Sequence, residues 1–421
     1  AWRRHGSQYG CLCGSHHHTG SRSSCALAVF LHWYLRVEQR DARHGMHFRA
    51  VHETFLHVLQ QSAGGAALRQ MLQRQEGLVD ALSAAATVLK ASGESRPRRI
   101  ARLQSMFESG GVLSGLRSFG TPLPLPLNPT MAVSGAVPSR ATVFKSALSP
   151  LGITFTLSPN ASTTYSIIFK SGDDLRQDQL VLQMLRLMDG LLQEQGLNLL
   201  LTPYRVLATA PGEGLVEMVP DCMPLAQVLA ENKNDIRRYL QKFHPDPAAP
   251  YGIVPQVLET FVKSCAGYCV AMYVMGVGDR HLDNLMLCSN GALFHIDFGF
   301  ILGRDPKPFP PPMKLCKEMV EAMGGAHSSE YERFRVLCCE AFNIIRASSN
   351  LILNLLMLMS DAGVQDIKNE QDVLKVAEKL RLELTNEEAS QFFQELINDS
   401  VTALFPQITE TIHRWAQYWR S

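Results

Sequence analysis

The sequence has no excess of charge of either sign. Its 40 lysines and arginines are matched by 39 aspartates and glutamates, which leaves a formal net charge of +1 over 421 residues. Such a chain exerts no global attraction on a polyanion, so we do not expect a nucleic-acid partner. Any phosphate group that the protein binds must be met by local charge.

Long apolar runs and abundant cysteines are also missing. The apolar stretch from Leu351 to Met359, for example, is interrupted by Asn354 and is far shorter than the roughly 18 residues that span a bilayer. Ten cysteines are too few for a disulfide scaffold of this length. Residues 1–30 lack the order of a secretory signal. We therefore expect a reduced, cytoplasmic protein, and the 46% of hydrophobic residues excludes a mostly disordered chain.

The N-terminal part of the sequence predicts helices without catalytic residues. Residues 1–24 are rich in Gly, Ser and His, and we expect a disordered tail there. Apolar residues recur at helical spacing from residue 25 to about 91, which predicts two or three packed helices within a helical domain over 25–110. The basic, Pro-broken segment Gly93–Arg99 predicts a solvated linker, and the four prolines between Thr121 and Thr130 predict an extended entrance to the next domain.

From residue 131 to about 220 the pattern changes to that of strands. We predict strands over Ile153–Leu157, Tyr165–Lys170, Tyr204–Thr209 and Leu215–Val219, with an amphipathic helix over Leu180–Glu194. Helices dominate beyond Pro224. The expected fold is α+β with two lobes, a sheet-bearing lobe over 121–220 and a larger helical lobe over 221–421, with a cleft between them.

The strongest chemical signal is Gly-Asp-Arg-His-Leu-Asp-Asn at 278–284, followed by His-Ile-Asp-Phe-Gly at 295–299. Phosphoryl transfer from a nucleotide needs carboxylate and amide oxygens for magnesium, a base near the attacking hydroxyl and a cation on the phosphates. A histidine can accept a proton near neutral pH. The candidates are Asp297 for the carboxylate, Asn284 for the amide, His281 for the base and Lys170 for the cation.

The short apolar run Ala292–Phe294 predicts a hairpin that brings Asn284 and Asp297 to one place. Taken singly, each motif has an ordinary alternative: Asp-Phe-Gly is common, Asp-Arg-His can be a helix-end ion pair, and Lys170 can be a solvated strand end. Their order and spacing together favour the catalytic interpretation.

These motifs resemble those of the phosphatidylinositol 3- and 4-kinase family. Lys170 with Ser-Gly-Asp-Asp-Leu-Arg-Gln-Asp at 171–178 is similar to the lipid-kinase lysine motif, and 278–284 is similar to the catalytic loop, which protein kinases carry in the opposite order as His-Arg-Asp. The segments at 201–204, 263–268, 301–308, 310–315 and 415–419 resemble the class III phosphatidylinositol 3-kinase catalytic subunit. The resemblance is dense over 121–421 and extends weakly to His32-Trp33-Tyr34.

The resemblance implies roles for individual residues. Catalysis would use Asp279, His281 and Lys170, with Mg²⁺ or Mn²⁺ on Asn284 and Asp297. ATP would be bound by a glycine-free phosphate loop, the lysine strand, a hinge and an apolar pocket, which together comprise Lys145, Ser146, Ile168, Lys170, Asp178, Tyr204, Glu217, Met218, Val219, Met286 and Ile296. Core packing is the alternative for Ile168, Met286 and Ile296. The activation loop that faces the substrate would include Asp297, Phe298, Gly299, Arg304, Lys307 and Lys314.

The implied activity is transfer of the γ-phosphate of ATP to the 3-hydroxyl of phosphatidylinositol on endosomal and autophagic membranes. The alternatives are a protein Ser/Thr kinase of the phosphatidylinositol-kinase-related group and an inactive fragment. The proline pattern at 308–313 argues against the first. Members of the family carry a C2 domain and a full helical domain before the position of residue 25. Because the regulatory kinase-like and beclin-type subunits bind mainly there, we do not expect this chain to join their complex.

Two features predict which lipid is the substrate and how the protein contacts the membrane. Only Arg304 and Lys307 precede the proline turn at 310–312, which predicts phosphatidylinositol without further phosphates as the substrate. Apolar residues at helical spacing from Phe405 predict a C-terminal helix whose Trp415 and Trp419 contact the membrane, with packing on the helical lobe as the alternative.

Overall fold

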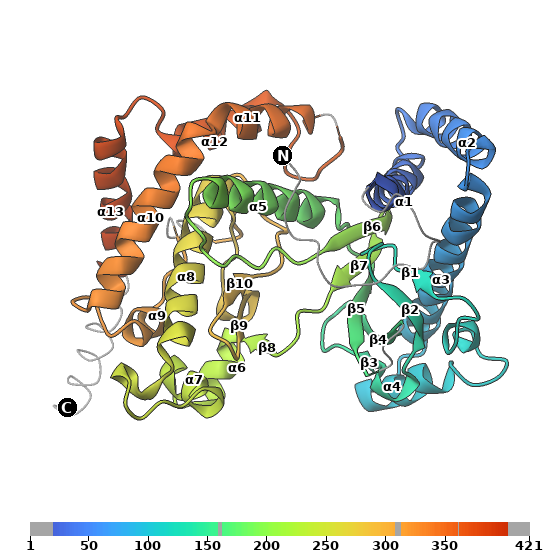
Figure 1. Cartoon of the computed structure of the whole chain (residues 1–421), viewed down its shortest axis with the longest axis horizontal. Helices are drawn as coiled ribbons and strands as arrows, with labels where there is room; N and C mark the ends of the chain where they lie inside the picture. The colour runs from blue at the N-terminus through green and yellow to red at the C-terminus, as the bar shows by residue number, and fades with distance from the viewer. Residues whose placement is uncertain (1–19, 159–161, 308–312, 361, 403–421) are drawn as a thin grey trace, which may run out of the picture. The chain divides into compact units, whose positions relative to one another are not determined.

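The computed structural model describes residues 20–158, 162–307, 313–360 and 362–402. The chain forms two compact units (Figure 1), the first from residues 1–173 and 207–216 and the second from 174–206 and 217–421. The first holds the large sheet and the second is mainly helical. The predicted α+β architecture, with a sheet-bearing part and a larger helical part, is confirmed.

Four helices begin the first unit: α1 (Gly20–Glu38), α2 (Gly45–Gln61), α3 (Gly65–Ala91) and α4 (Arg96–Ser105). The first three confirm the predicted helices, although α1 begins before residue 25. The connection between α2 and α3 depends on glycine, because Gly64 has a φ of 76° and a Cβ at Gly65 would lie 1.6 Å from the Leu59 carbonyl oxygen.

The prediction of a solvated linker at Gly93–Arg99 is only partly right, because the segment is mostly exposed but the connection ends at Ser95. The helix α4 begins at Arg96 and carries Pro97 in its first turn, where the missing backbone N–H would have had no partner within the helix. Arg96 Nε donates to the Val143 carbonyl at 2.7 Å, and Arg99 Nη1 donates to Ser149 Oγ at 2.7 Å. Two of the three basic residues of this segment, Arg96 and Arg99, are therefore bonded to the strand region that follows.

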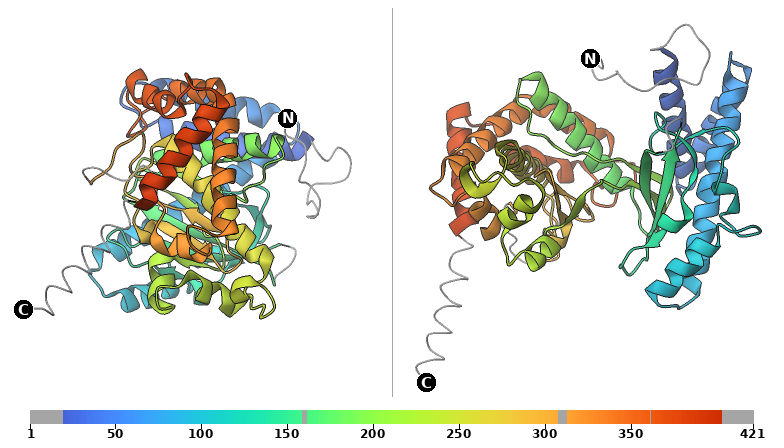
Figure 2. Two further views of the ribbon diagram at one scale, coloured as in Figure 1. Left: turned by 90° about the vertical axis from the view of Figure 1, so that its left-hand side faces the viewer. Right: turned by 60° about the horizontal axis from the view of Figure 1, so that its bottom comes forward.

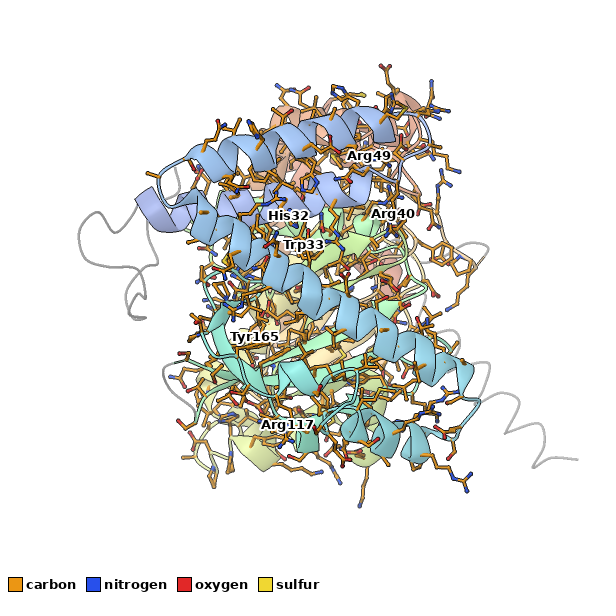
Figure 3. The ribbon with its side chains drawn as sticks, turned by 90° about the vertical axis from the view of Figure 1, so that its right-hand side faces the viewer. His32, Trp33, Arg40, Arg49, Arg117 and Tyr165 are labelled. Carbon is orange, nitrogen blue, oxygen red and sulfur yellow. The ribbon has the colours of Figure 1, made fainter. Side chains whose placement is uncertain are left out.

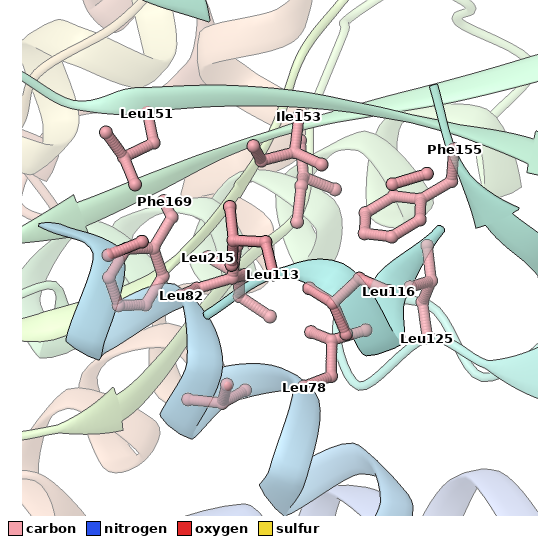
Figure 4. Packing of buried hydrophobic residues seen from close by; sticks show 14 of the residues in the cluster. Leu78, Leu82, Leu113, Leu116, Leu125, Leu151, Ile153, Phe155, Phe169 and Leu215 are labelled. Atoms are coloured by element: carbon pink, nitrogen blue, oxygen red, sulfur yellow. The ribbon is translucent and has the colours of Figure 1, made fainter. Parts of the chain in front are cut away.

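The sheet of the first unit has the strand order β1-β2-β4-β5-β7-β6, with β3 paired to β4. The strands are β1 (Leu123–Pro124), β2 (Ala132–Ala136), β3 (Thr142–Val143), β4 (Leu151–Leu157), β5 (Thr164–Ser171), β6 (Val206–Ala210) and β7 (Glu213–Glu217). The four predicted strands are present, but the last ends at Glu217 instead of Val219. Figure 2 shows α3 running along this sheet, and Figure 4 shows the core between them, where Leu78 and Leu82 of α3 lie near Phe155 and Phe169.

The second unit contains nine helices within the described ranges. They are α5 (Arg176–Glu194), α6 (Leu225–Glu231), α7 (Ile236–Phe243), α8 (Pro255–Met275), α9 (Lys317–Ala322), α10 (Ser329–Ala347), α11 (Ser349–Leu358), α12 (Glu370–Leu380) and α13 (Asn386–Thr402). A small antiparallel sheet has the order β10-β9-β8, from β8 (Cys222–Pro224), β9 (Leu285–Cys288) and β10 (Leu293–His295). Short 3₁₀ helices lie at Ser114–Leu116, Pro138–Arg140, Pro250–Gly252 and Leu282–Asn284.

The helix α8 forms the centre of the second unit. By length and composition it could cross a membrane, as could α10 and α11 if that pair, bent by 64°, were one span. However, 83% of the apolar window of α8 is buried inside the protein, where α8 packs against α10 and β10. An apolar helix enclosed in this way is a core helix of a folded domain.

A mostly buried polar chain joins α1, α2 and α3, and Figure 3 labels its residue His32 and the adjacent Trp33. His52 Nε2 lies 2.9 Å from His32 Nδ1, and His32 Nε2 lies 3.2 Å from Glu76 Oε1. Beside them, Trp33 Nε1 donates to Gln75 Oε1 at 3.1 Å. Burial, with the nearby His32, lowers the pKa of His52 to about 4. His52 is therefore neutral in the folded protein at physiological pH.

We expect acid to destabilise these helices through His52. Its folded pKa of about 4 lies below the ordinary 6.5, so the unfolded chain binds more protons and stability falls as the pH drops from 6.5 towards 4. The loss should reach about 3 kcal/mol at most. Differential scanning fluorimetry at pH 7 and pH 5 should show a smaller acid shift in His52→Gln than in the parent chain. Equal shifts would contradict the assignment.

Candidate active site

The loop at 278–284 connects α8 to β9 and is fixed at its beginning by backbone contacts. Gly278 N donates to the Phe300 carbonyl at 2.9 Å, and a Cβ at residue 278 would lie 2.1 Å from the Arg304 carbonyl oxygen. Asp279 follows with a φ of 51°, and its N–H donates to Asp305 Oδ2 at 2.8 Å. Left-handed backbone at a non-glycine residue is typical of functional loops that the surrounding structure holds in place.

The candidate base, His281, lies on this loop between two carboxylates. Its Nε2 is 3.9 Å from Asp279 Oδ2, and its Nδ1 is 3.9 Å from Asp283 Oδ2. The His281 side chain is 42% exposed. A reacting hydroxyl could therefore reach the ring, and the adjacent Asp279 could orient it and stabilise its protonated form.

The two candidate metal ligands are brought together by the β9–β10 hairpin, as the sequence predicted. Asn284 precedes β9, and its backbone carbonyl accepts a hydrogen bond from Ile296 N at 3.0 Å. Asp297 is the next residue after Ile296; it has an exposed side chain and a φ of 63°. The two candidate metal ligands thus lie at the same end of the hairpin.

The side chains of both residues suit a hard cation. Asn284 Nδ2 donates to the Asp279 carbonyl at 3.0 Å, which fixes the amide and leaves Oδ1 without a hydrogen bond to any described residue. Carboxylate and amide oxygens are the ligands that Mg²⁺ takes in proteins, usually together with substrate phosphates and water. The described residues contain no cluster of three or more His, Cys, Asp and Glu side chains that could hold a metal.

Arg280 is the site residue whose role the sequence did not reveal. Its Nε donates to the Gly278 carbonyl at 2.7 Å, its Nη1 to the Ile296 carbonyl at 2.9 Å, and its Nη2 to the Asp297 carbonyl. The guanidinium also lies 5.7 Å from the centre of the Phe298 ring. Burial lowers the Arg280 pKa, and the nearby carboxylates oppose this effect. Arg280 thus joins the loop at 278–284 to the segment after β10 that carries Asp297.

Two residues at the start of α5, Gln177 and Asp178, bind the backbone of Phe298, the residue after Asp297. Phe298 N donates to Asp178 Oδ1 at 3.3 Å, and Gln177 Nε2 donates to the Phe298 carbonyl at 2.8 Å. Gln177 also pairs with Asp366, because Gln177 Nε2 lies 3.1 Å from Asp366 Oδ2 and Asp366 N lies 2.9 Å from Gln177 Oε1. Asp178, expected at the nucleotide site, therefore contacts the Asp-Phe-Gly backbone directly.

The candidate activation loop, which follows Asp297, contacts two further carboxylates, those of Asp366 and Asp372. Ile301 N donates to Asp366 Oδ2 at 3.0 Å. Arg304 Nε lies 3.5 Å from Asp366 Oδ1, and Arg304 Nη2 lies 3.5 Å from Asp372 Oδ1. The Arg304 charge is therefore matched by two carboxylates. Lys307 is exposed, whereas burial lowers the pKa of Lys314.

The candidate hinge connects β7 to β8. Glu217 N donates to the Arg205 carbonyl at 2.8 Å, and Glu217 Oε2 accepts from Arg205 N at 2.8 Å, so its carboxylate is engaged. The Met218 side chain is 41% exposed. The Val219 carbonyl accepts a hydrogen bond from Cys222 Sγ at 3.1 Å. Backbone N–H and C=O groups in such a connection could form hydrogen bonds with the edge of a planar heterocycle.

Tyr204 and the apolar candidates differ in burial. Tyr204 is buried, packs edge-on against Phe294 at 5.9 Å, and has its pKa raised by burial. Ile168, Met286 and Ile296 are instead half-buried, although they lie next to buried residues in or beside their strands. This pattern argues against the core-packing alternative, because these side chains lie on the less buried face.

The remaining candidates lie in the first unit. Lys170, near the end of β5, has Nζ 3.0 Å from Asp173 Oδ2. Lys145 and Ser146 are exposed on the loop between β3 and β4, and Ser149 in that loop has a φ of 50°. A hollow of about 400 Å³ adjoins the loop and is lined by Arg96, Arg99, Val143, Phe144, Lys145, Ser146, Ala147 and Ser149. The loop is thus glycine-free, but it carries Lys145 and is flanked by Arg96 and Arg99.

Some sequence predictions fall outside the described residues. These are Trp415 and Trp419 at the expected membrane contact, the prolines at 308–312 and residues 1–19 of the expected tail.

Comparison with known proteins indicates the same family that the sequence motifs resemble. Residues 164–369 match the family model described as phosphatidylinositol 3- and 4-kinase. Over 403 residues the chain is 52% identical to "Phosphatidylinositol 3-kinase, root isoform" of Glycine max, covering 94% of this chain and 49% of that protein. It is 46% identical over 404 residues to "Phosphatidylinositol 3-kinase pik3" of Schizosaccharomyces pombe, covering 95% and 50%.

"Phosphatidylinositol 3-kinase VPS34" of Saccharomyces cerevisiae is 42% identical over 398 residues, covering 94% of this chain and 44% of that protein. The chain therefore spans about half the length of the curated relatives it matches.

Proposed function

Because this chain carries a catalytic domain of the phosphatidylinositol 3- and 4-kinase family, we propose that it transfers the γ-phosphoryl group of ATP to the 3-hydroxyl of phosphatidylinositol. The observation that carries this proposal is the hairpin bond from Ile296 N to the Asn284 carbonyl. This bond supports the proposal because it joins the two segments that would carry the metal ligands, beside a loop that bears a candidate base. The catalytic domain would extend over 121–421, after a helical region over 25–110.

Each site residue then has one task. Asp297 and Asn284 would hold Mg²⁺, which supplies charge neutralisation on the phosphoryl group being transferred. Lys170 would bind the ATP phosphates. His281 would accept the proton of the 3-hydroxyl, with Asp279 orienting it. The nucleotide base would lie against the backbone of Glu217, Met218 and Val219.

The experiment that tests the activity uses γ-labelled ATP in three reactions. We expect label in lipid when phosphatidylinositol vesicles are present, little in an added protein substrate, and slow ATP hydrolysis without either. Label mainly in protein would support the protein-kinase alternative. No label in any product from a folded chain would support the inactive alternative.

We further expect the chain to prefer phosphatidylinositol over its 4,5-bisphosphate. A bisphosphate needs clustered cations, and Arg304 is already paired with Asp366 and Asp372. The rate ratio should be about tenfold or more, since each missing charged hydrogen bond is worth about 1.5 kcal/mol or more. Initial rates on vesicles of each lipid would measure it. Comparable rates would contradict the expectation.

A second prediction concerns the phosphate loop. Arg96 and Arg99 bond to Val143 and Ser149 at its two ends, so they would hold the loop in its nucleotide-binding shape. Arg96→Ala combined with Arg99→Ala should raise the KM for ATP about tenfold and leave the KM for lipid unchanged. The matched control is Arg98→Ala, which removes an exposed arginine of the same turn. An equal rise in the KM for ATP in the control would mean that loss of positive charge, and not loss of the loop contacts, causes the effect.

The C-terminal segment completes the proposal. The substrate remains in a bilayer, so the enzyme must act at a membrane surface, and Trp415 and Trp419 would contact that surface. We propose a peripheral location on endosomal and autophagic membranes.

A further inference from the structure

Two cysteines face each other beside the candidate hinge. Cys222 on β8 is the register partner of Cys288 on β9. The neighbouring pair, Asp221 and Ser289, is joined by a hydrogen bond from Ser289 N to the Asp221 carbonyl at 2.9 Å. Because bonded and non-bonded pairs alternate along an antiparallel ladder, Cys222 and Cys288 form a non-hydrogen-bonded pair.

This register suits a covalent link. The Cα atoms of a non-hydrogen-bonded pair lie about 4.5 Å apart, within the roughly 4.4–6.8 Å range of disulfides. Side chains of directly opposed residues lie on the same face of the sheet, so the two thiols are neighbours. Formation of a disulfide here needs little movement of the backbone.

Cys222 is also accessible and more acidic than an ordinary thiol. It is half-buried and lines a hollow of about 450 Å³, together with Asp221, Met223, Tyr239, Phe243, His244 and Ser289. Interaction with the neighbouring Cys288 thiol lowers the pKa of Cys222, and the same interaction raises the pKa of Cys288. Burial raises the pKa of other described cysteines, namely Cys265, Cys269, Cys316, Cys338 and Cys339. Oxidants attack thiolates, so Cys222 is the expected first target.

The Cys222 thiol has a second contact that connects it to the hinge. Its Sγ donates to the Val219 carbonyl at 3.1 Å, within the β7–β8 connection. A sulfur atom bonded to Cys288 has no hydrogen to donate. Oxidation would therefore remove a bond that fixes the backbone of the hinge.

We propose that Cys222 and Cys288 are a site of reversible oxidation by peroxide, and that the resulting disulfide weakens nucleotide binding at the hinge. Hydrogen peroxide first converts the Cys222 thiol to a sulfenic acid and releases one water. The Cys288 thiol then displaces the sulfenic hydroxyl, which forms the S–S bond and releases a second water. Two thiols lose two electrons and one peroxide gains them. The second half of the proposal rests on the proposed function.

The test treats the full chain with hydrogen peroxide, maps peptides without reduction and measures binding of a fluorescent ATP analogue. We expect a peptide linked through Cys222 and Cys288, and a dissociation constant raised about fivefold, the effect of losing one hydrogen bond. Dithiothreitol should restore binding. Cys222→Ser keeps a donor for the Val219 carbonyl but cannot form the disulfide, so it should bind ATP normally and resist peroxide. The control Cys25→Ser should remain sensitive.

Each contrary outcome overturns a different part of the proposal: the oxidation site or the effect on the hinge. Absence of the linked peptide overturns the oxidation site, whether or not the chain binds ATP. A linked peptide with unchanged binding overturns the hinge effect, as does sensitivity that persists in Cys222→Ser. A reduced chain that binds no nucleotide contradicts the proposed function and the hinge effect, but the peptide map still decides the oxidation site.

Discussion

Replacement of Asp297 by asparagine should lower kcat by about a thousandfold or more, because it removes the negative oxygen that would hold the metal ion. The fold should be unaffected. The Asp297 side chain is exposed, and asparagine tolerates its left-handed φ of 63° as well as aspartate does. Measurement of kcat on phosphatidylinositol vesicles, with the melting temperature alongside, would test both expectations.

The matched control is Asp283→Asn, on the same loop. The Asp283 side chain is 73% exposed and lies near His281. Its replacement by asparagine removes the same charge as Asp297→Asn but no candidate metal ligand. We expect its kcat to change by less than about tenfold. A loss of activity in Asp297→Asn that is accompanied by an equal fall in stability would mean that Asp297 is a structural carboxylate.

Replacement of Arg280 by lysine should lower kcat by about a hundredfold even though the charge is retained. The guanidinium donates to the carbonyls of Gly278, Ile296 and Asp297, which a single ammonium group cannot reach together. Loss of two charge-assisted bonds is worth about 3 kcal/mol. We expect the Mg²⁺ concentration for half-maximal rate to rise as well, because the segment after β10 that carries Asp297 loses its support.

Arg238→Lys serves as the control for Arg280→Lys. Arg238 is 52% exposed and pairs only weakly with Asp235, at 3.5 Å. Its replacement should leave kcat and the Mg²⁺ dependence unchanged. If Arg280→Lys lowers the melting temperature but leaves the Mg²⁺ dependence unchanged, then Arg280 supports the fold without positioning the metal ligands.

Local patterns were sufficient for the parts of the site that lie close together in sequence. The motifs at 278–284 and 295–299 flank a short apolar run, so the hairpin that joins Asn284 to Asp297 could be predicted. The strands around Lys170 followed from alternation. In contrast, α4 was missed because its proline and basic residues are typical of a linker, and nothing local shows that Arg96 and Arg99 have partners about fifty residues away.

Contacts between distant segments account for the rest. Asp366 belongs to no recognisable motif, yet it binds Gln177 of α5 and Arg304 of the activation segment. Arg280 lies inside a predicted motif, but its role depends on carbonyl groups sixteen or seventeen residues further along. The pairing of Cys222 with Cys288 depends on the register of β8 against β9. Such contacts are set by tertiary packing, which single-sequence patterns do not contain.

The position of the transferred phosphate tests the central claim most directly. The chain is incubated with γ-labelled ATP, Mg²⁺ and phosphatidylinositol vesicles, and the labelled lipid is deacylated and separated by chromatography against the 3-, 4- and 5-phosphate standards. We predict label at the 3-position, and its absence with Asp297→Asn. Label at another position, or label in lipid that persists with Asp297→Asn, would contradict the account.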